Sequence, residues 1–331
     1  DAPPVSLGSS NDYTFSPDGK EVCFVRNMDE IVAASTNNDL FINNLANGNI
    51  TRLTENKGND NNPNYSPDGK YIAFKSMLRP GFEADKYRLM LYDRKKKTFG
   101  DLTQDFDLSV NSIVWHPNGK EIYFTVSERG TASIYKVGLK DKKIVPVLKG
   151  QNLSGLQFLN KNELIFKKQT ASMPYEIFKF SLEDKSLKQL SQINTELLAQ
   201  LELPSLESFD YTGAKGDKVQ GFLIKPPFFD PDKKYPTIQL IHGGPQGSWE
   251  DDFHYRWNYQ MFAAPGYVVY MVNFHGSTGY GQDFTDAVSK DWGGAPYDDI
   301  KLGTDYVIKN YPFIDADNIG AAGASSNSSL I

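Results

Sequence analysis

Pro236-Thr-Ile-Gln-Leu-Ile-His242-Gly243-Gly244-Pro245 and Asn318-Ile-Gly-Ala-Ala-Gly323-Ala324-Ser325-Ser326-Asn327 are the two stretches that decide the fold of the last third of the chain. Each is a short apolar run that ends in small residues, as expected of a buried parallel strand that leads into a tight turn. An α/β-hydrolase sheet needs two such turns. One is a strand-to-helix elbow that exposes a serine Oγ, and the other is a loop whose backbone N–H binds an oxyanion. The second stretch matches most of the G-x-S-x-G elbow, and the first provides a candidate oxyanion loop.

Apolar strands alternate with helical segments around these two stretches. The patterns predict strands over 208–211, 221–226, 235–241, 267–273 and 319–322, and helices over 259–264, 282–291 and 296–311. The strand at 267–273 is continuously apolar, which is typical of a sheet that is covered on both faces. Alternating strands and helices of this kind predict a parallel, doubly wound sheet.

The first part of the chain contains a repeat with a period of fifty residues. Its copies are Ser16-Pro17-Asp18-Gly19-Lys20, Ser66-Pro67-Asp68-Gly69-Lys70 and His116-Pro117-Asn118-Gly119-Lys120, with a weaker fourth copy at 156–166. Each copy follows an aromatic residue and precedes alternating apolar residues. Proline sets φ for a turn and Asp/Asn-Gly tolerates positive φ, so each copy predicts a β-hairpin.

Further apolar strands follow these hairpins at matching places, over 39–43, 88–92 and 133–137. Four strands per repeat at this period are typical of the blades of a β-propeller. About four blades are visible, whereas a closed ring usually needs more, so we expect the propeller to be incomplete in this chain. The expected domains are propeller blades over 1–195, a linker over 196–207 and the N-terminal part of an α/β-hydrolase domain over 208–331, truncated after the nucleophile elbow.

Composition excludes several classes of protein. The chain has 331 residues, 39% of them hydrophobic, and a net charge of −6, which argues against a nucleic-acid partner. No apolar run approaches the roughly 20 residues needed to span a bilayer. Cys23 is alone and is expected to be a buried, inert thiol. Neither a metal-ligand cluster nor a nucleotide-binding G-x-G-x-x-G motif is present, so we expect neither metal nor cofactor.

The insert at 78–88 carries charged residues between two strands of the second blade. A solvated loop is the expectation for such a segment, and a charged surface that faces a partner is the alternative.

The order of the motifs resembles that of a known family. The SPDGK-type repeats are followed by His-Gly-Gly-Pro, by Asn-Phe-His-Gly-Ser-Thr-Gly-Tyr-Gly-Gln-Asp-Phe over 273–284, by Asp-Trp-Gly-Gly over 291–294 and by the elbow. This order resembles the acylaminoacyl-peptidase and dipeptidyl-peptidase 5 branch of the prolyl oligopeptidase family of serine peptidases. The resemblance implies a propeller that caps an α/β-hydrolase domain. It also implies an enzyme that removes dipeptides or acylated residues from the N-terminus of short oligopeptides.

The resemblance also assigns roles to residues of the two turns. Ser325 matches the nucleophile, Gly244 and Ser326 would offer the oxyanion N–H groups, and His242 and Gly243 would support the loop. The family usually has an aromatic residue and two glycines after the nucleophile, whereas this chain has Ser-Asn-Ser over 326–328.

The rest of the triad has no candidate in this chain. In this fold the chain order is Ser, then Asp, then His, but His116, His242, His254 and His275 all precede Ser325. His116 is expected in a hairpin turn, and His254 and His275 are expected to be structural or to lie on the surface. We therefore expect the chain to be a fragment that lacks the triad Asp and His and is inactive by itself.

Two other functions fit the same motifs. One is an esterase with the same machinery, because the elbow does not specify a substrate. The other is a non-catalytic propeller that binds a partner and carries a decayed hydrolase domain. Under the peptidase hypothesis we expect short peptides as substrates, a homodimer, no nucleic acid and no membrane partner. A periplasmic or secreted location is expected, with the cytoplasm as the alternative.

Overall fold

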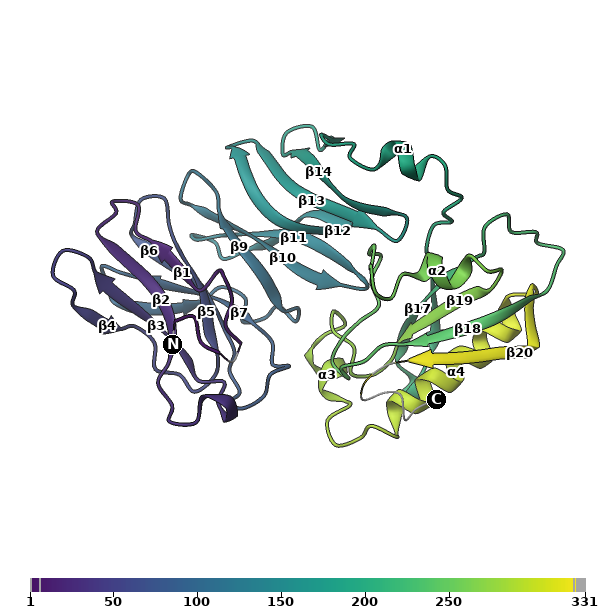
Figure 1. Ribbon diagram of the computed structural model, residues 1–331. Coiled ribbons are helices and arrows are strands. Elements are labelled where there is room, and N and C mark those ends of the chain that lie inside the picture. Colours follow the sequence, from purple (N-terminus) through teal and green to yellow (C-terminus); the bar gives the residue numbers. More distant parts are fainter. Residues whose placement is uncertain (1, 6, 324, 326–331) are drawn as a thin grey trace.

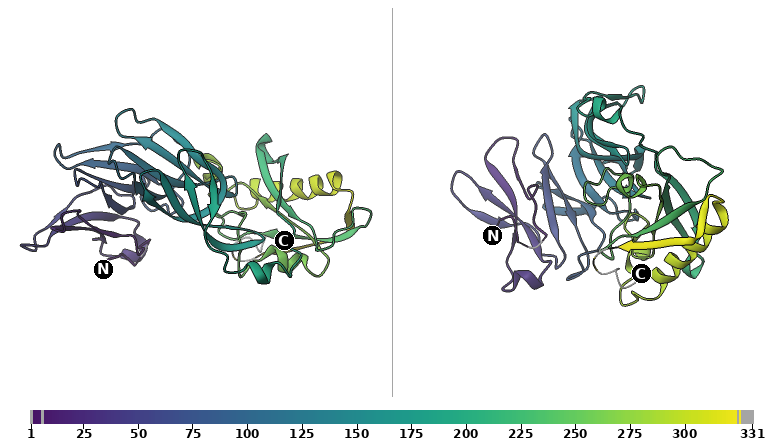
Figure 2. Two further views of the ribbon diagram at one scale, coloured as in Figure 1. Left: turned by 90° about the horizontal axis from the view of Figure 1, so that it is seen from above. Right: turned by 45° about the vertical axis from the view of Figure 1, so that its right-hand side comes forward.

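The computed structural model describes residues 2–5, 7–323 and 325. Antiparallel sheets follow one another along an arc, and a mixed sheet with its helices lies beyond the end of that arc (Figure 1). In both views of Figure 2 the first sheet, in purple, lies far from the last helix and strand, in yellow. No helix of the described residues has the length and apolar character needed to cross a membrane.

The first two sheets each contain four strands in sequence order. The first consists of β1 (Tyr13–Phe15), β2 (Glu21–Asn27), β3 (Asn38–Asn44) and β4 (Ile50–Arg52). The second consists of β5 (Asp60–Tyr65), β6 (Tyr71–Ser76), β7 (Arg88–Asp93) and β8 (Thr98–Asp101). All neighbouring strands are antiparallel, as expected of propeller blades.

The third sheet joins two blades through one long strand. Its order is β15-β14-β13-β12-β11-β10-β9. The strands are β9 (Val110–Trp115), β10 (Glu121–Glu128), β11 (Thr131–Gly138), β12 (Ile144–Asn160), β13 (Glu163–Thr170), β14 (Met173–Ser181) and β15 (Leu187–Gln189). The 17-residue β12 pairs with β11 through its first half and with β13 through its second half. It is therefore the last strand of the third blade and the first strand of the fourth.

The predicted hairpin turns are confirmed. Gly19, Gly69 and Gly119 have φ of +69°, +68° and +67°, which is why the turns need glycine. In the first two turns the Ser Oγ donates to the Asp Oδ1 two residues later, at 2.6 and 2.8 Å. In the third, His116 takes the place of serine, and its Nδ1 accepts the N–H of Asn118 at 3.0 Å.

The blades stack through apolar side chains of neighbouring sheets. Cys23, Val25 and Leu40 of the first blade form one cluster with Tyr65, Ile72 and Phe74 of the second. Cys23 is fully buried and burial raises the pKa of its thiol, which confirms the expected inert cysteine. The second and third blades are also joined by a hydrogen bond from the Trp115 indole to the Asn64 carbonyl, at 3.0 Å.

An ion pair occupies matching places in the first two blades with its charges exchanged. Arg52 binds Asp39 at 2.6 Å between β4 and β3, and Arg88 binds Asp101 at 3.3 Å between β7 and β8. Cross-strand pairs of opposite charge stabilise a sheet in either orientation. The repeat therefore conserves the interaction while the residue types at the two positions change.

The mixed sheet contains five strands in the order β16-β17-β19-β18-β20. They are β16 (Glu207–Thr212), β17 (Lys218–Ile224), β18 (Tyr235–Ile241), β19 (Val268–Asn273) and β20 (Ile314–Gly323). The last three strands of that order are parallel, and β16 and β17 form an antiparallel hairpin at the edge. The helices are α1 (Thr195–Leu198) before the sheet, and α2 (Tyr259–Ala263), α3 (Gln282–Asp286) and α4 (Ala295–Asn310).

Two boundaries differ by five residues from the sequence-based expectation. The helix expected over 282–291 ends at Asp286, after which the chain turns and buries Val288. A Cβ on Gly276 would lie 2.8 Å from the Val288 Cβ, so this turn packs tightly on its neighbour. The last strand begins at Ile314, five residues before the expected start at 319.

Helices cover both faces of the mixed sheet, as the apolar run of β19 predicts. Alternate residues of β19 face the two sides. Val268, Tyr270 and Val272 pack in a cluster with Ile300 and Val307 of α4. Val269 and Met271 pack with Tyr259 and Ala263 of α2.

Two hairpin tips of the third and fourth blades are embedded in the mixed-sheet region. A Cβ on Gly130, between β10 and β11, would lie 2.3 Å from Phe222 of β17, so only glycine fits there. Ala171, between β13 and β14, is 2% exposed and belongs to the cluster around α2. Its N–H donates to Asp251 Oδ1 at 2.7 Å. These blades are therefore held to the sheet by close packing.

The insert at 78–88 contacts the mixed-sheet region through charges, so the expectation of a purely solvated loop is wrong. Arg79 donates to Asp286 of α3 through two nitrogens, at 2.5 and 3.0 Å, and to Asp85 at 2.6 Å. Gln282 of α3 donates to the Ala84 carbonyl at 3.1 Å. The surface that these charges face is therefore the chain's own mixed-sheet region.

Asp60 is a buried carboxyl between the first two blades. It is 1% exposed, and neither of its oxygens makes a hydrogen bond of normal geometry within the described residues. Burial raises the pKa of Asp60 to about 7, although the nearby Ser76 and Thr54 hydroxyls act in the opposite direction. The corresponding residue of the third blade, fifty positions later, is the buried Val110.

Substitution of Asp60 by Asn is expected to stabilise the protein at alkaline pH. The carboxyl has a pKa of about 7 in the folded protein and about 4 when unfolded. The folded state therefore binds the proton more tightly, and the wild type loses stability as pH rises between these values. The free energy of unfolding of Asp60→Asn should exceed that of the wild type by up to about 4 kcal/mol at pH 8. The two values should be equal near pH 4. Urea unfolding at both pH values measures this.

Asp105→Asn is the control, because Asp105 is exposed. Its free energy of unfolding should equal that of the wild type at both pH values. An Asp60→Asn variant whose advantage does not change with pH would show that Asp60 is not a buried neutral carboxyl.

A double-mutant cycle of Arg79→Ala and Asp286→Ala should give a measurable coupling free energy. The pair is bidentate, but its side chains are 40% and 30% exposed, so solvent screens it. The expected coupling is about 0.5–1 kcal/mol and should decrease with added salt. Urea unfolding of the four proteins measures it. The same cycle on the exposed Lys20–Asp18 pair should give a value near zero, and equal couplings would contradict the prediction.

Candidate active site

Two turns leave neighbouring strands at the same edge of the mixed sheet. Ile241, the last residue of β18, is paired with Gly323, the last residue of β20. The strands are parallel, so the segments that follow them begin side by side. The His242-Gly243-Gly244-Pro245 loop and the turn that carries Ser325 are therefore neighbours.

Ser325 has the backbone conformation of a sharp turn. Its φ is +66°, in the left-handed region that residues other than glycine seldom adopt, and it is exposed. A nucleophile elbow holds its serine in a strained strand-to-helix turn, so that Oγ projects from the sheet. Ser326, the second expected oxyanion donor, lies outside the described residues.

The loop after β18 is built around glycines that admit no side chain. Gly244 has φ of +140°, and a Cβ there would lie 2.6 Å from the backbone nitrogen of Gln246. A Cβ on Gly247 would lie 3.0 Å from the Gly243 carbonyl oxygen. The tight path of this loop exposes backbone rather than side chains, which is what an anion-binding loop requires.

His242 is a neutral support of this loop. Burial lowers the pKa of His242 to about 4, against the raising effect of the Gly243 carbonyl. In the neutral ring, Nδ1 carries the proton and donates to that carbonyl at 2.9 Å. Nε2 then accepts the Ser277 hydroxyl, also at 2.9 Å. The ring also stacks on Phe274 at 4.2 Å. These contacts fix the start of the loop.

The segment after β19 supports the same loop from the other side. The N–H of Thr278 donates to the Gly247 carbonyl at 2.9 Å. Asn273, fully buried at the end of β19, accepts the N–H of Trp249 at 2.7 Å and donates to its carbonyl at 2.9 Å. Sequence reasoning missed the role of Asn273. The signal was an amide residue at the end of an otherwise apolar strand.

The other three histidines are held by contacts of their own. The Nε2 of His116 bonds the Lys161 carbonyl at 2.9 Å, and His254 Nδ1 accepts two backbone N–H groups at 3.1 and 2.8 Å. His275 lies between Asp299 and Asp217. The structure therefore places His116, His254 and His275 in local structural contacts.

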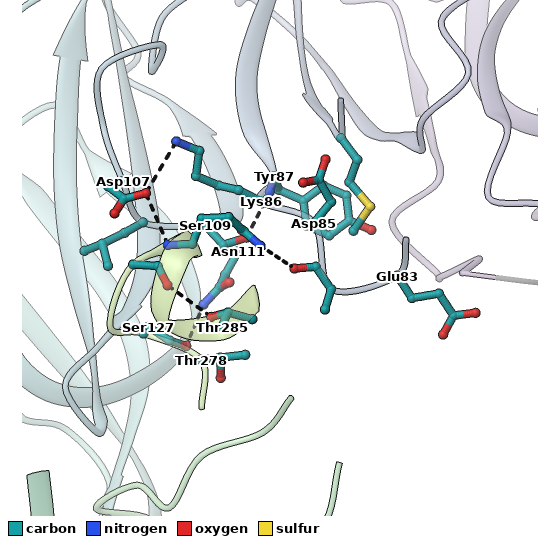
Figure 3. A pocket seen from close by; sticks show the side chains of 16 residues that line it. Glu83, Asp85, Lys86, Tyr87, Asp107, Ser109, Asn111, Ser127, Thr278 and Thr285 are labelled. Atoms are coloured by element: carbon teal, nitrogen blue, oxygen red, sulfur yellow. Dashed lines mark hydrogen bonds and ion pairs between the residues drawn. The ribbon is translucent and has the colours of Figure 1, made fainter. Parts of the chain in front are cut away.

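A cavity of about 240 Å³ lies between the second and third blades and the segment after β19. Its propeller wall includes Lys86, Tyr87 and Asn111, and its hydrolase wall includes Thr278 and Thr285 (Figure 3). Most labelled side chains gather around this space, whereas Glu83 points away from it. Because Thr278 also holds Gly247, the cavity adjoins the loop after β18.

The polar groups of this cavity suit a peptide more than an apolar ligand. Lys86 and Asp107 approach each other at 3.9 Å, and the N–H of Tyr87 donates to the Ser109 hydroxyl at 3.1 Å. Hydroxyl and amide side chains of this kind can donate to and accept from a peptide backbone. Within residues 2–5, 7–323 and 325, no three His, Cys, Asp or Glu side chains are grouped as metal ligands.

Family models match two parts of the chain. Residues 253–326 match the prolyl oligopeptidase family, and residues 16–77 match the N-terminal region of dipeptidyl peptidase IV. The first match includes the elbow, and the second covers most of the first blade and part of the second.

Curated relatives and solved structures agree with these matches. The chain is 31% identical over 98% of its length to dipeptidyl-peptidase 5 of Porphyromonas gingivalis, and covers 48% of that protein. It is 32% identical over 90% of its length to dipeptidyl-peptidase 5 of Schizosaccharomyces pombe, and covers 44% of it. Acylaminoacyl peptidase of Pyrococcus horikoshii matches 96% of the chain at a TM-score of 0.80 and 24% identity, with 48% of that structure covered.

The chain thus spans about half the length of the curated relatives it matches. Its blades, its mixed sheet and the order of its motifs all agree with the same assignment. The part of the chain that includes Ser325 matches the prolyl oligopeptidase family, and nearly the whole chain is similar to dipeptidyl-peptidase 5 proteins.

Proposed function

We propose that the protein to which this chain belongs is a serine exopeptidase. It releases dipeptides, or acylated residues, from the N-terminus of short oligopeptides through an acyl-enzyme. The observation that carries the proposal is the placement of Ser325 on a left-handed turn next to the glycine loop after β18. The names of the relatives, dipeptidyl-peptidase 5 and acylaminoacyl peptidase, support the substrate class.

In the proposed reaction, Ser325 Oγ attacks the scissile carbonyl carbon while its proton passes to a base. The carbonyl π electrons move to oxygen, and the N–H groups of Gly244 and Ser326 stabilise the oxyanion. The C–N bond then breaks and the amine leaves with a proton from the protonated base. Water hydrolyses the resulting ester and restores the serine.

The neutral state of His242 suits its supporting role. A ring whose pKa burial lowers to about 4 stays uncharged at neutral pH and keeps Nε2 available to the Ser277 hydroxyl. The base and the acid of the triad are proposed to follow Ser325, as the order Ser, Asp, His of this fold requires.

The cavity in Figure 3 is the proposed place for part of the peptide substrate. It has walls from both the propeller and the hydrolase part, and Thr278 connects it to the glycine loop. A peptide that fills it would have to be extended and short, because blades enclose one side. This supports an exopeptidase over an esterase for bulky lipids.

The full-length protein should react with a fluorophosphonate at Ser325 and hydrolyse dipeptidyl p-nitroanilides. Ser325→Ala should abolish both, because no other group would attack the carbonyl. Peptide mapping by mass spectrometry locates the label, and absorbance measures hydrolysis. Faster hydrolysis of p-nitrophenyl esters than of any peptide amide would favour an esterase. A full-length protein that neither labels nor hydrolyses would favour a non-catalytic binding protein.

Gly244→Ala in the full-length protein should lower kcat by about 100-fold, the typical effect of losing one oxyanion donor. The added Cβ would lie 2.6 Å from the Gln246 nitrogen and displace the loop. Gly266→Ala is the matched control. Gly266 also has positive φ, +104°, but a Cβ there would meet no atom within 4 Å. Equal losses of kcat in the two variants would contradict a specific role for the Gly244 loop.

A further inference from the structure

His275 is enclosed by two carboxylates just after β19. It is 2% exposed. Its Nδ1 lies 2.6 Å from Asp299 Oδ2, and its Nε2 lies 3.1 Å from Asp217 Oδ2. The ring stacks on Phe284 of α3 at 4.3 Å. Three elements therefore converge on this one imidazole: α4, α3 and the connection between β16 and β17.

Hydrogen-bond chemistry determines the charge of this ring. Asp299 already accepts the backbone N–H of Ala214 at 2.7 Å and that of His275 at 2.7 Å, so its carboxylate acts as an acceptor. When both neighbours of an imidazole are acceptors, both ring nitrogens must donate, and only the imidazolium cation has two N–H groups. Burial opposes this charge, but Asp299 and then Asp217 outweigh it, so the pKa of His275 is raised.

The same turn that carries His275 also holds the glycine loop. The N–H of Ser277 donates to the Phe274 carbonyl at 2.9 Å and closes the turn. The Ser277 hydroxyl then reaches His242, as described above, and Thr278 reaches Gly247. The segment 274–278 is therefore anchored on one side by His275 and on its other side supports the loop after β18.

Other charged groups surround the same site. A cavity next to His275 is lined by Lys215 and Asp217 of the β16–β17 connection, Lys218 of β17, Asp283 of α3 and Tyr280. Lys218 pairs with Asp210 at 2.7 Å. Asp283 lines the same cavity but makes no hydrogen bond to His275 among those of the described residues. It therefore provides a matched carboxylate for comparison with Asp217.

We infer that His275 is a positioning residue: held as an imidazolium between Asp299 and Asp217, it anchors the 274–278 turn that keeps the glycine loop in place. The inference rests on the proposed function for its catalytic consequence, because that loop is the proposed oxyanion site. Loss of the proton would leave a nitrogen lone pair facing a carboxylate, and the repulsion would loosen the turn. The ring holds its proton more tightly in the folded protein, so its pKa is raised. The stabilising effect of the His275 cation is therefore complete below about pH 6.5, the pKa of a free histidine. It is lost as the pH rises through the pKa of the folded state.

Nuclear magnetic resonance of the ¹⁵N-histidine-labelled 331-residue chain tests the charge directly. At pH 7 both ring nitrogens of His275 should be protonated. Asp217→Asn, at a side chain that is 59% exposed, should lower the titration midpoint of His275 by about one pH unit. Asp283→Asn should leave the midpoint unchanged. A His275 that is neutral at pH 7, or equal midpoints in the two variants, would overturn the inference.

The link to the glycine loop has its own readout without any enzyme activity. The ring resonances of His242 should change as His275 titrates, because the 274–278 turn carries both His275 and Ser277, whose hydroxyl bonds the His242 ring. The pH at which the His242 resonances change should be lower in Asp217→Asn than in the wild type. It should be the same as in the wild type in Asp283→Asn. If the His242 resonances stay constant while His275 titrates, the 274–278 turn does not couple the two rings.

Kinetics of the full-length enzyme test the catalytic consequence. In Asp217→Asn the alkaline limb of kcat should move to lower pH by the same interval as the midpoint of His275, with KM little changed. At pH 6 kcat should match that of the wild type, and Asp283→Asn should match it throughout. An unmoved alkaline limb, in an enzyme whose His275 midpoint has moved, would disprove the positioning role. If the wild type hydrolyses no peptide, the proposed function fails, and the resonance experiments alone decide the inference.

Discussion

The parallel pairing of β18 with β20 is the constraint from which the site follows. It places Ile241 beside Gly323, so two turns from distant parts of the chain begin at one edge of the sheet. One of these turns carries a serine in a left-handed conformation, and the other is a glycine loop that admits no side chain. Neither turn has a chemical role alone. Their adjacency brings the proposed nucleophile and the proposed anion-binding loop into one site.

Two histidines next to this edge show how environment assigns different states to the same residue type. His242 is buried against Phe274 with a carbonyl and a hydroxyl as partners, so burial keeps it neutral. His275 is equally buried, but its partners are carboxylates, which favour the cation. The sequence does not distinguish the two histidines, because each follows an apolar strand. Their charge states differ because different side chains surround them in the folded protein.

Local chemistry made the hairpins, most strands and the two turns predictable from the sequence. Glycine at 19, 69 and 119, with the preceding proline, specifies a turn wherever it stands, and alternating or continuous apolar runs specify which faces are buried. Contacts between distant residues leave no such pattern. The Arg79–Asp286 pair joins residues 207 positions apart, and the buried Asp60 occupies a place where the next blade has Val110. For the same reason a loop expected to be solvated proved to be part of an interface.

The long strand β12 has a consequence for the mechanics of the arc. It is shared by two blades of one sheet, so neither the third nor the fourth blade can release this strand without exposing an edge of the other blade. Those are the blades whose tips, at Gly130 and Ala171, are embedded beside the mixed sheet. The first two blades are separate sheets that reach the same region through the Arg79 charges. The half of the arc that packs closely on the mixed sheet is therefore expected to open locally at a higher free energy than the half formed by the two separate blades.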